Sequence, residues 1–550
     1  MKIQIPLLTL LVVTQMTIAQ NGYEADTWTA LQTMWNAETD EDRAAALALY
    51  EAAFQRYPDS IEEIGLYKAS VLAGELWQLD KSFDYLYRLH EEIEDQATGW
   101  DYVAGEYGRS EWANLVGDPR WAALERQQLI RKEQFFQQLA ASEAEFRKPA
   151  TVRFDGKGNF PVSAEFLPKE HRHYSLQYAF DDTTATSYFV ALPENYDPQR
   201  SYPMLVFLHG AVRHNEATPF QNSEVLDGWN RFYTKYADRD EVILVFPQAD
   251  KRYNWMTTLN GFDYLPNIVA EIKRAVNVDD DRVFVSGHSN GATGSFNYWL
   301  RQPTAFAGFF GFNTYPKVFT GGTFLGNGNN RSYVNFSTDE DYYYPTGAND
   351  SLTLLANRLG LEYEDRRYPG FPHWFPEFDE SEPAVASIFE RMKTVRRDPF
   401  PREIYREIDD LRDGRADWLE ITALDTTAAP AAWQRNHNFG ITEWLDYDDN
   451  DSLVVLSVDK RAFAYPRRSG AVRAEYENNR FDLTTSRVGA VRLYLSPSMI
   501  DWNQPIFVYI DGKQVHSGRL SLDREVLSAE YARTGDRRQV YGAVLDFRVE

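Results

Sequence analysis

Short, fully apolar runs that alternate with helix-like stretches in the middle of the chain most strongly constrain its fold. Three such runs are PMLVFLHG (203–210), EVILVFP (241–247) and RVFVSG (282–287). None alternates polar with apolar residues, which is typical of strands buried on both faces. Between the last two runs, FDYLPNIVAEIKRAV (262–276) carries apolar residues at helical spacing. Alternation of buried strands and helices predicts an α/β fold, a mostly parallel sheet covered by helices on both faces.

The pattern differs on either side of this region, so the chain of 550 residues is predicted to hold about three domains. Residues 20–148 carry apolar residues at helical spacing, and ALALYEAAFQRYP (46–58) matches only the second half of a tetratricopeptide repeat. We therefore expect a degenerate repeat-like helical domain, whose residues either pack paired helices or form a groove for a protein partner. Residues 149–400 hold the α/β pattern.

After residue 400, strand-like runs separated by turn signals replace the helical spacing. These runs lie at 418–425, 452–459, 470–479, 489–497, 505–512 and 542–549. We expect all of them to join one β-sandwich-like domain over 401–550.

The first residues, MKIQIPLLTLLVVTQMTIAQ, combine a lysine, a short apolar stretch and small residues. They predict a signal peptide over 1–19 and a secreted or periplasmic protein, with an N-terminal membrane anchor as the alternative. No later stretch predicts an integral membrane span, and no cysteine is present for disulfides or thiolate metal sites. The net charge of −25 argues against nucleic acid as a partner. It indicates a solvated acidic surface or a preference for neutral or cationic substrates.

Gly287-His288-Ser289-Asn290-Gly291 follows the third apolar run and precedes a helix-like stretch that begins with small residues. Glycines two residues on either side of a serine suit a nucleophile elbow, because strand and helix there approach too closely for side chains. The alternative is a glycine-rich loop without chemistry. His209-Gly210-Ala211 also follows an apolar run, so the amides of Ala211 and Asn290 are the predicted oxyanion donors. His209 itself is expected to be a structural residue of the turn.

An acid and a histidine follow at the ends of two later predicted strands. STDEDYYYP (337–345) offers Asp339, Glu340 and Asp341, and GFPHW (370–374) contains His373. The order serine, acid, histidine is that of α/β-hydrolases, in which the acid orients the histidine and the histidine activates the serine. We therefore expect a serine hydrolase that works through an acyl-enzyme. This chemistry needs no metal and no cofactor.

Residues from about 175 to 395 resemble the α/β-hydrolase superfamily, most closely the secreted bacterial branch of polyhydroxybutyrate-depolymerase-like, feruloyl and acetyl xylan esterases. ALPENYDPQRSYPMLVFLHG (191–210), VDDDRVFVSGHSNGA (278–292) and the spacing from Asp341 to Pro345 carry the resemblance. The acid of this family usually precedes such a proline by four residues, which favours Asp341 as the partner of Ser289 and His373. The family's G-T-x-D pattern is not reproduced in STDED, which leaves Asp339 as the alternative.

Aromatic residues near the motifs are the candidates for substrate binding: Tyr342, Tyr343, Trp374 and Trp255. Flat aromatic side chains suit sugar rings or aromatic acyl groups, and packing within the loops is the alternative. The expected function is hydrolysis of a carboxylic ester, on an acylated polysaccharide or a small molecule. A serine peptidase of the same fold and a catalytically inert binding or scaffold protein are the competing hypotheses.

Overall fold

Residues 22–91, 99–154, 162–448 and 452–550 are described by the computed structural model of the chain. Contacts between residues divide the chain into two compact units, Met1–Ala141 and Ser142–Glu550. The predicted signal peptide over 1–19 lies outside the described residues. Among the helices that the structure describes, none is long and apolar enough to cross a membrane. The predicted domain boundaries at 148 and 400 stay predictions.

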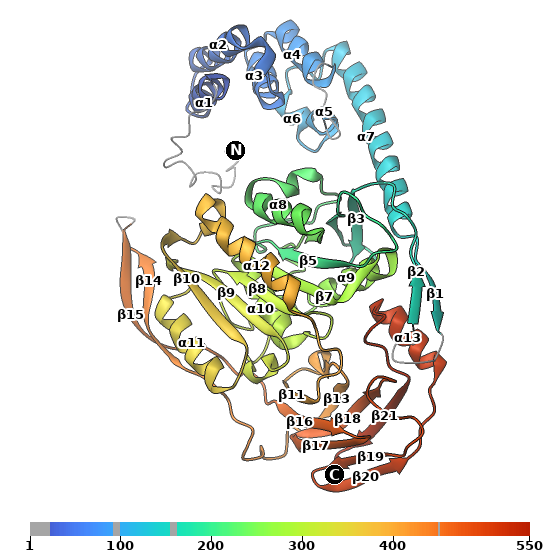
Figure 1. The fold of residues 1–550 in the computed structure, drawn as a ribbon. Coiled ribbons are helices and arrows are strands. Elements are labelled where there is room, and N and C mark those ends of the chain that lie inside the picture. Colours follow the sequence, from blue (N-terminus) through green and yellow to red (C-terminus); the bar gives the residue numbers. More distant parts are fainter. Residues whose placement is uncertain (1–21, 92–98, 155–161, 449–451) are drawn as a thin grey trace. The chain divides into compact units, whose positions relative to one another are not determined.

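The first unit consists of helices, drawn in blue to cyan in Figure 1. They are α1 (Gly22–Trp35), α2 (Asp40–Arg56), α3 (Glu63–Glu75), α4 (Leu79–Glu91), α5 (Asp101–Ala104), α6 (Gly108–Glu111) and the first part of α7 (Pro119–Phe146). Helix α1 packs on α2, and α3 packs on α4. Ala46, Tyr50 and Ala53 of the repeat-like segment are all buried. These residues therefore pack the helices, and a protein partner for this unit stays a prediction.

The second unit is built on an eight-stranded sheet of order β10-β9-β8-β7-β5-β6-β4-β3. The strands are β3 (His173–Ala179), β4 (Ala185–Ala191), β5 (Tyr202–Leu208), β6 (Ile243–Pro247), β7 (Val278–Gly287), β8 (Gly308–Phe312), β9 (Ser332–Glu340) and β10 (Tyr363–Pro372). Neighbouring strands from β10 to β6 run parallel, whereas β4 pairs antiparallel with both β6 and β3. The predicted mostly parallel sheet is confirmed. The carboxyl ends of β5, β7, β9 and β10 consequently share one edge.

Helices cover both faces of this sheet (Figure 1). One face carries α9 (Tyr264–Ala275), α10 (Asn290–Arg301) and α11 (Thr346–Arg358), and the other carries α8 (Arg231–Asp240) and α12 (Glu382–Thr394). Successive residues of β5 divide between the faces, since Val206 lies in the core with α9 and α10 and Phe207 in the core with α8 and α12. A strand buried on both sides has no polar face, which is why these strands are continuously apolar.

After α12 the chain forms two further sheets around one core. One sheet contains β11 (Glu403–Ile408), β16 (Gly470–Glu477), β17 (Arg480–Ser486), β19 (Ile506–Ile510) and β20 (Lys513–Gly518). The other contains β12 (Arg415–Ala416), β13 (Leu419–Leu424), β18 (Val488–Leu495) and β21 (Ala543–Arg548). Leu483 of the first sheet and Leu419 of the second belong to the same buried cluster. Helix α13 (Arg524–Thr534) precedes β21, and a separate pair, β1 (Thr151–Phe154) and β2 (Val162–Glu165), precedes β3.

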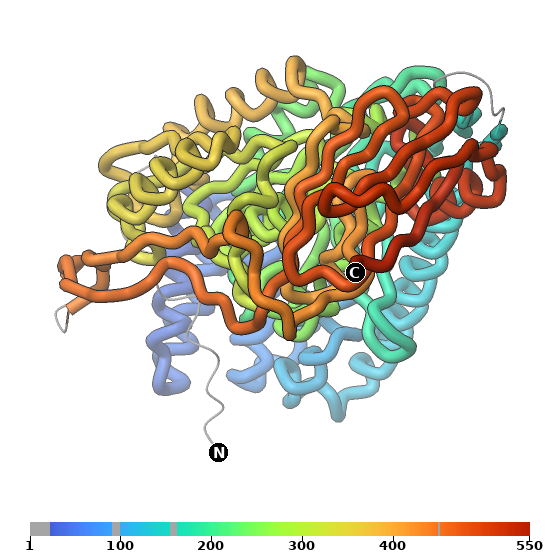
Figure 2. The backbone as a smooth tube through the Cα atoms, turned by 90° about the horizontal axis from the view of Figure 1, so that it is seen from below, coloured from blue at the N-terminus to red at the C-terminus, as the bar shows by residue number. Residues whose placement is uncertain are grey.

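One strand-like run does not join these two sheets. Strand β15 (Leu453–Arg461), which contains most of the predicted sandwich strand 452–459, pairs with β14 (Gly440–Tyr447) in a separate two-stranded sheet. We call this pair of strands, residues 440–447 and 453–461, the arm; it is drawn in orange and projects to the side in Figure 2. Placing 452–459 in a sandwich is therefore wrong, because Trp444 and Val458 of the arm pack against the α/β core instead.

Buried charges connect the α/β core with the β-rich region inside the second unit. Arg397, after α12, pairs with Asp281 of β7 at 3.0 Å and with Asp536, after α13, at 2.8 Å. Lys273 of α9 lies 2.7 Å from the same Asp536. Burial alone would raise the pKa of Asp536, but Arg397 and Lys273 hold that pKa well below its usual range. This carboxylate is therefore charged and joins segments far apart in the sequence.

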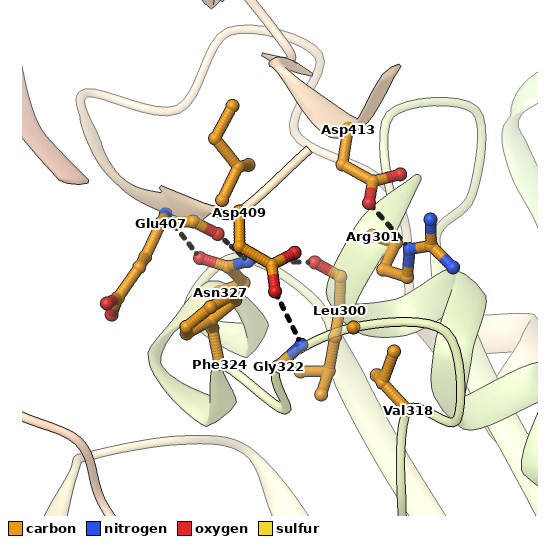
Figure 3. A pocket seen from close by; sticks show the side chains of 11 residues that line it. Leu300, Arg301, Val318, Gly322, Phe324, Asn327, Glu407, Asp409 and Asp413 are labelled. Carbon is orange, nitrogen blue, oxygen red and sulfur yellow. Dashed lines mark hydrogen bonds and ion pairs between the residues drawn. The ribbon is translucent and has the colours of Figure 1, made fainter. Parts of the chain in front are cut away.

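A small cavity lies at another place along this boundary (Figure 3). Beside it, Arg301 of α10 pairs with Asp413 at 2.7 Å, and Asp409 accepts a hydrogen bond of 2.9 Å from the amide of Gly322. The cavity encloses about 10 Å³, which is room for about one water molecule. It is a packing feature and is too small for an organic ligand.

Candidate active site

The serine motif forms the turn between β7 and α10. Strand β7 ends at Gly287 and α10 begins at Asn290. Ser289 has φ 57° and ψ −118°, a conformation that residues other than glycine adopt only under strain. A Cβ atom at Gly291 would lie 1.8 Å from the carbonyl oxygen of Leu208, and one at Gly287 would lie 2.4 Å from the backbone of Gly291. Close approach of the backbone therefore requires both glycines, as a nucleophile elbow predicts.

The loop after β5 passes directly beside the serine. A Cβ atom added at Gly210 would lie 3.2 Å from the Cβ of Ser289, and Ala211 follows with a left-handed φ of 54°. Within the described ranges, the amides of Ala211 and Asn290 donate to no backbone carbonyl, whereas the amide of Ser289 donates to the carbonyl of Phe312 at 3.0 Å. The two predicted oxyanion donors are thus open to a ligand.

Asp341 and His373 follow β9 and β10 and meet at the same edge of the sheet. The Oδ1 atom of Asp341 lies 2.9 Å from the Nδ1 atom of His373, and both side chains are buried. The same carboxylate oxygen accepts a hydrogen bond of 2.8 Å from the amide of Tyr343. Asp339 instead accepts a hydrogen bond of 2.7 Å from the amide of Gly370. The structure therefore brings Asp341, and not Asp339, to the histidine.

Two side chains for which the sequence predicts no catalytic role hold the backbone of His373. Its carbonyl oxygen accepts hydrogen bonds from Nε2 of His288 at 2.9 Å and from Nδ2 of Asn313 at 2.8 Å. Burial and the neighbouring His373 lower the pKa of His288 to about 3. His288 is therefore neutral near pH 7, and its one ring proton lies on Nε2. The residue before the serine thus positions the predicted catalytic histidine. His288 was visible inside the serine motif, whereas no sequence signal points to Asn313.

His209 and His373 differ in which ring nitrogens are occupied. Nε2 of His209 accepts a hydrogen bond of 3.0 Å from the amide of Ala249, and its Nδ1 donates to the carbonyl of Gly210 at 2.7 Å. Burial lowers the pKa of His209 to about 4, so this residue is a neutral structural histidine, as expected. In His373, by contrast, Nε2 has no hydrogen-bond partner among the described residues. The hydrogen-bonding capacity of that nitrogen is therefore unused within the described residues.

Two of the four predicted substrate residues lie beside His373, and a third packs against one of these two. The ring centroids of Tyr343 and Trp374 lie 4.2 Å and 5.2 Å from that of His373. Tyr342 is half-buried, and its ring centroid lies 4.2 Å from that of Tyr343.

The prediction for Trp255 is wrong. Its side chain is fully buried between the ring of His209 and the backbone of Gly294 in α10. Trp255 therefore packs against the helix that follows the serine. Its ring is not accessible to a substrate.

Two aromatic side chains near the site are not predicted by any motif. The ring centroid of Trp229, just before α8, lies 5.0 Å from that of His288. The ring centroid of Tyr447, in the arm, lies 5.1 Å from that of Tyr342. Both are distant in sequence from the serine, acid and histidine segments, so only the fold places them here. In the part of the chain that the structure describes, no three His, Asp or Glu side chains are grouped to hold a metal ion.

Comparison with known protein families finds one match in the middle of the chain. A family model described as putative esterase matches residues 183–318, which contain both the loop after β5 and the serine motif. Residues 183–318 are thus similar to an esterase domain. The chain is accordingly an enzyme of the serine ester hydrolase class. No curated protein matches the chain at a significant level.

Solved structures with a similar region include several esterases. A thermostable esterase has a TM-score of 0.34 and 19% identity, over 45% of this chain and 70% of its own. A ferulic acid esterase has a TM-score of 0.32 and 16% identity, over 40% of this chain and 99% of its own. A fluorophosphonate-binding serine hydrolase of Staphylococcus aureus has a TM-score of 0.31 and 16% identity, over 40% and 98%. Similarities of this extent do not define a substrate.

Proposed function

We propose that the chain is a secreted serine esterase that cleaves a carboxylic ester on an acylated polysaccharide, with Ser289, His373 and Asp341 as its catalytic triad. The observation that carries the proposal is the buried contact of 2.9 Å between Asp341 and His373, at the sheet edge that also carries the Ser289 turn. The esterase match supports it independently, because the matched residues include Ser289 and Ala211.

In the proposed reaction, Nε2 of His373 removes the proton from the Ser289 hydroxyl while its oxygen attacks the ester carbonyl carbon. Asp341 accepts the hydrogen bond from Nδ1, which keeps the proton on that nitrogen and leaves Nε2 free as the base. The amides of Ala211 and Asn290 donate to the oxyanion that develops on the substrate. Loss of one such donor typically costs about 3 kcal/mol of transition-state stabilisation.

The tetrahedral intermediate collapses when His373 gives its proton to the leaving alcohol oxygen, which leaves the acyl group on Ser289. A water molecule then attacks this acyl-enzyme while His373 again takes a proton. The second collapse returns the proton to Ser289 and releases the carboxylic acid. His373 thus takes one proton from Ser289 and one from water, and it gives one to the leaving alcohol and one back to Ser289.

Two features support the polysaccharide part of the proposal. Tyr343 and Trp374 lie beside His373 and are 42% and 45% exposed, and flat aromatic rings suit the apolar faces of sugars. The N-terminal residues have the pattern of a signal peptide. This pattern supports secretion, which would bring the enzyme into contact with extracellular polysaccharides.

A substrate panel tests the proposed function. It contains acetyl, feruloyl and short-chain acyl esters, with aminoacyl amides to detect a peptidase. The wild type is expected to hydrolyse esters, and Ser289→Ala is expected to lose this activity while keeping the circular dichroism spectrum of the wild type. Preferential cleavage of the amides would favour the peptidase hypothesis. Folded wild type that turns over neither class would favour an inert scaffold.

A further inference from the structure

The aromatic side chains beside the site continue into a row that passes the catalytic histidine and ends on the arm. This aromatic row consists, in order, of Trp229, Trp374, His373, Tyr343, Tyr342 and Tyr447. Successive ring centroids lie 6.3, 5.2, 4.2, 4.2 and 5.1 Å apart. Its members come from the segment before α8, from the loops after β9 and β10, and from the end of β14. Separate parts of the fold therefore build one surface around His373.

Three members of the row face solvent. Trp374, Tyr343 and Tyr447 are 45%, 42% and 50% exposed. They are connected through the buried His373 and the half-buried Tyr342, and contiguous exposed apolar surfaces on soluble proteins often mark sites for ligands or partners. Because the row includes His373, the ligand it fits is one that reaches the catalytic residues.

The arm is held in a way that leaves Tyr447 exposed. Trp444 makes ring contacts with Tyr344 at 6.3 Å and with Tyr315 at 6.1 Å, so this residue anchors the arm on the α/β core. Tyr447, at the end of β14, contacts Tyr342 with its ring and stays half exposed. Within the same strand, Trp444 therefore holds the arm on the core, and Tyr447 remains accessible to a ligand.

The chemistry of the row favours a neutral sugar chain. Its side chains are tryptophan, tyrosine and histidine, whose flat faces suit sugar rings while their polar edges remain in water. Two exposed residues close to Tyr342 and Tyr447 in the sequence are acidic, namely Glu340 and Asp446. These carboxylates and the net charge of −25 oppose an anionic polymer such as a polyuronate.

We infer that the aromatic row binds a neutral polysaccharide chain and that Tyr447 of the arm is a specificity-determining residue, stacking on a sugar ring beyond the one that carries the scissile ester. The inference rests on the proposed function, because it extends the same site. A chain bound along the row passes His373, which presents its ester groups to the catalytic residues. A small ester reaches the same residues without Tyr447, so only longer substrates depend on the arm.

Binding of unacylated neutral hexasaccharides tests the row without relying on catalysis. Xylohexaose, cellohexaose and mannohexaose are titrated calorimetrically into the full-length protein, with an oligogalacturonide of equal length as the anionic comparison. The wild type is expected to bind at least one neutral chain and not the anionic one. Tyr447→Ala is expected to weaken binding about five- to tenfold, whereas Tyr447→Phe, which keeps the ring, binds like the wild type. Lack of binding to all three neutral chains, or equal binding by Tyr447→Ala, overturns the inference.

Kinetics separate a failure of this inference from a failure of the proposed function. For Tyr447→Ala, kcat/KM on an acetylated xylo-oligosaccharide is expected to fall through KM, with 4-nitrophenyl acetate hydrolysis unchanged. If the variant slows both substrates equally, Tyr447 is only structural and the inference fails while the proposed function stands. If Ser289→Ala keeps the activity of the wild type, the proposed function fails, and the binding measurement still decides whether the row takes a sugar chain.

Discussion

At the scale of single residues, the site depends on contacts that fix the orientation of His373. Asp341 occupies Nδ1 of its ring, while His288 and Asn313 both donate to its carbonyl oxygen. The adjacent Ser289 is held in a strained backbone conformation between two closely packed elements. The ring of His373 is therefore positioned by Asp341, and its backbone is positioned by His288 and Asn313.

Replacing either acid shows which carboxylate orients His373. Asp341→Asn is expected to lower kcat for ester hydrolysis by about 10⁴-fold, because an amide in this place favours the wrong tautomer of the histidine. Asp339→Asn is the matched control, and its activity is expected to stay close to that of the wild type because Asp339 binds the amide of Gly370. Similar losses in the two variants would contradict the assignment of Asp341.

Stability in acid reports on the buried His288. Its pKa of about 3 in the folded protein lies below the ordinary value of 6.5, so between these values the unfolded chain binds a proton that the folded chain does not. The free energy of unfolding therefore falls as the pH drops from 6.5 towards 3, by up to about 1.4 kcal/mol per pH unit for this group. In urea unfolding between these pH values, His288→Gln is expected to show a shallower fall. An unchanged slope would mean that His288 is not held neutral.

At the scale of helices and strands, the parallel sheet gathers the catalytic groups at one edge. The ends of β5, β7, β9 and β10 are followed by Ala211, Ser289, Asp341 and His373, respectively. The sequence was sufficient to predict this arrangement, because each buried strand is continuously apolar and each group follows a strand within a few residues.

Other features were beyond the reach of the sequence for physical reasons. The run 452–459 has the apolar, β-branched composition of a sandwich strand, and composition does not determine which sheet a strand joins. Trp255 and Trp374 both stand near motifs, yet one lies beneath α10 and the other faces solvent. Only tertiary packing separates a supporting aromatic side chain from one that is able to contact a substrate.

The anchoring of the arm is tested by hydrogen exchange. Trp444→Ala removes the ring contacts with Tyr344 and Tyr315, so amides of β14 and β15 are expected to exchange faster while those of the eight-stranded sheet keep their protection. Leu456→Ala is the matched control, since Leu456 lies directly across from Trp444 in the hairpin and is 42% exposed. Exchange in the arm that is the same for both variants would show that Trp444 is not the anchor.

At the scale of the whole molecule, the second unit combines the α/β core and the β-rich region through buried charges. Asp536 stands between Lys273 and Arg397, and all three side chains are almost completely buried. A buried charge that loses its partner is strongly destabilising, because its desolvation is no longer offset. These contacts explain why the two regions form one compact unit despite their different patterns in the sequence.

Removal of Asp536 tests this connection. Asp536→Ala is expected to lower the free energy of unfolding by about 3–5 kcal/mol, because Lys273 and Arg397 lose their shared carboxylate. Asp546→Ala, which breaks an exposed pair with Arg492, is the control and is expected to change this free energy by about 1 kcal/mol or less. Chemical denaturation followed by fluorescence measures both. Equal destabilisation by the two substitutions would contradict a structural role for the buried cluster.

Covalent labelling of the serine is the most direct test of the proposed chemistry. The wild-type protein is treated with a fluorophosphonate and analysed by mass spectrometry, first intact and then as peptides. One adduct is expected, on the peptide that contains Ser289, and none is expected in Ser289→Ala. An adduct on a different residue, or equal labelling of Ser289→Ala, would contradict the assignment of Ser289 as the nucleophile.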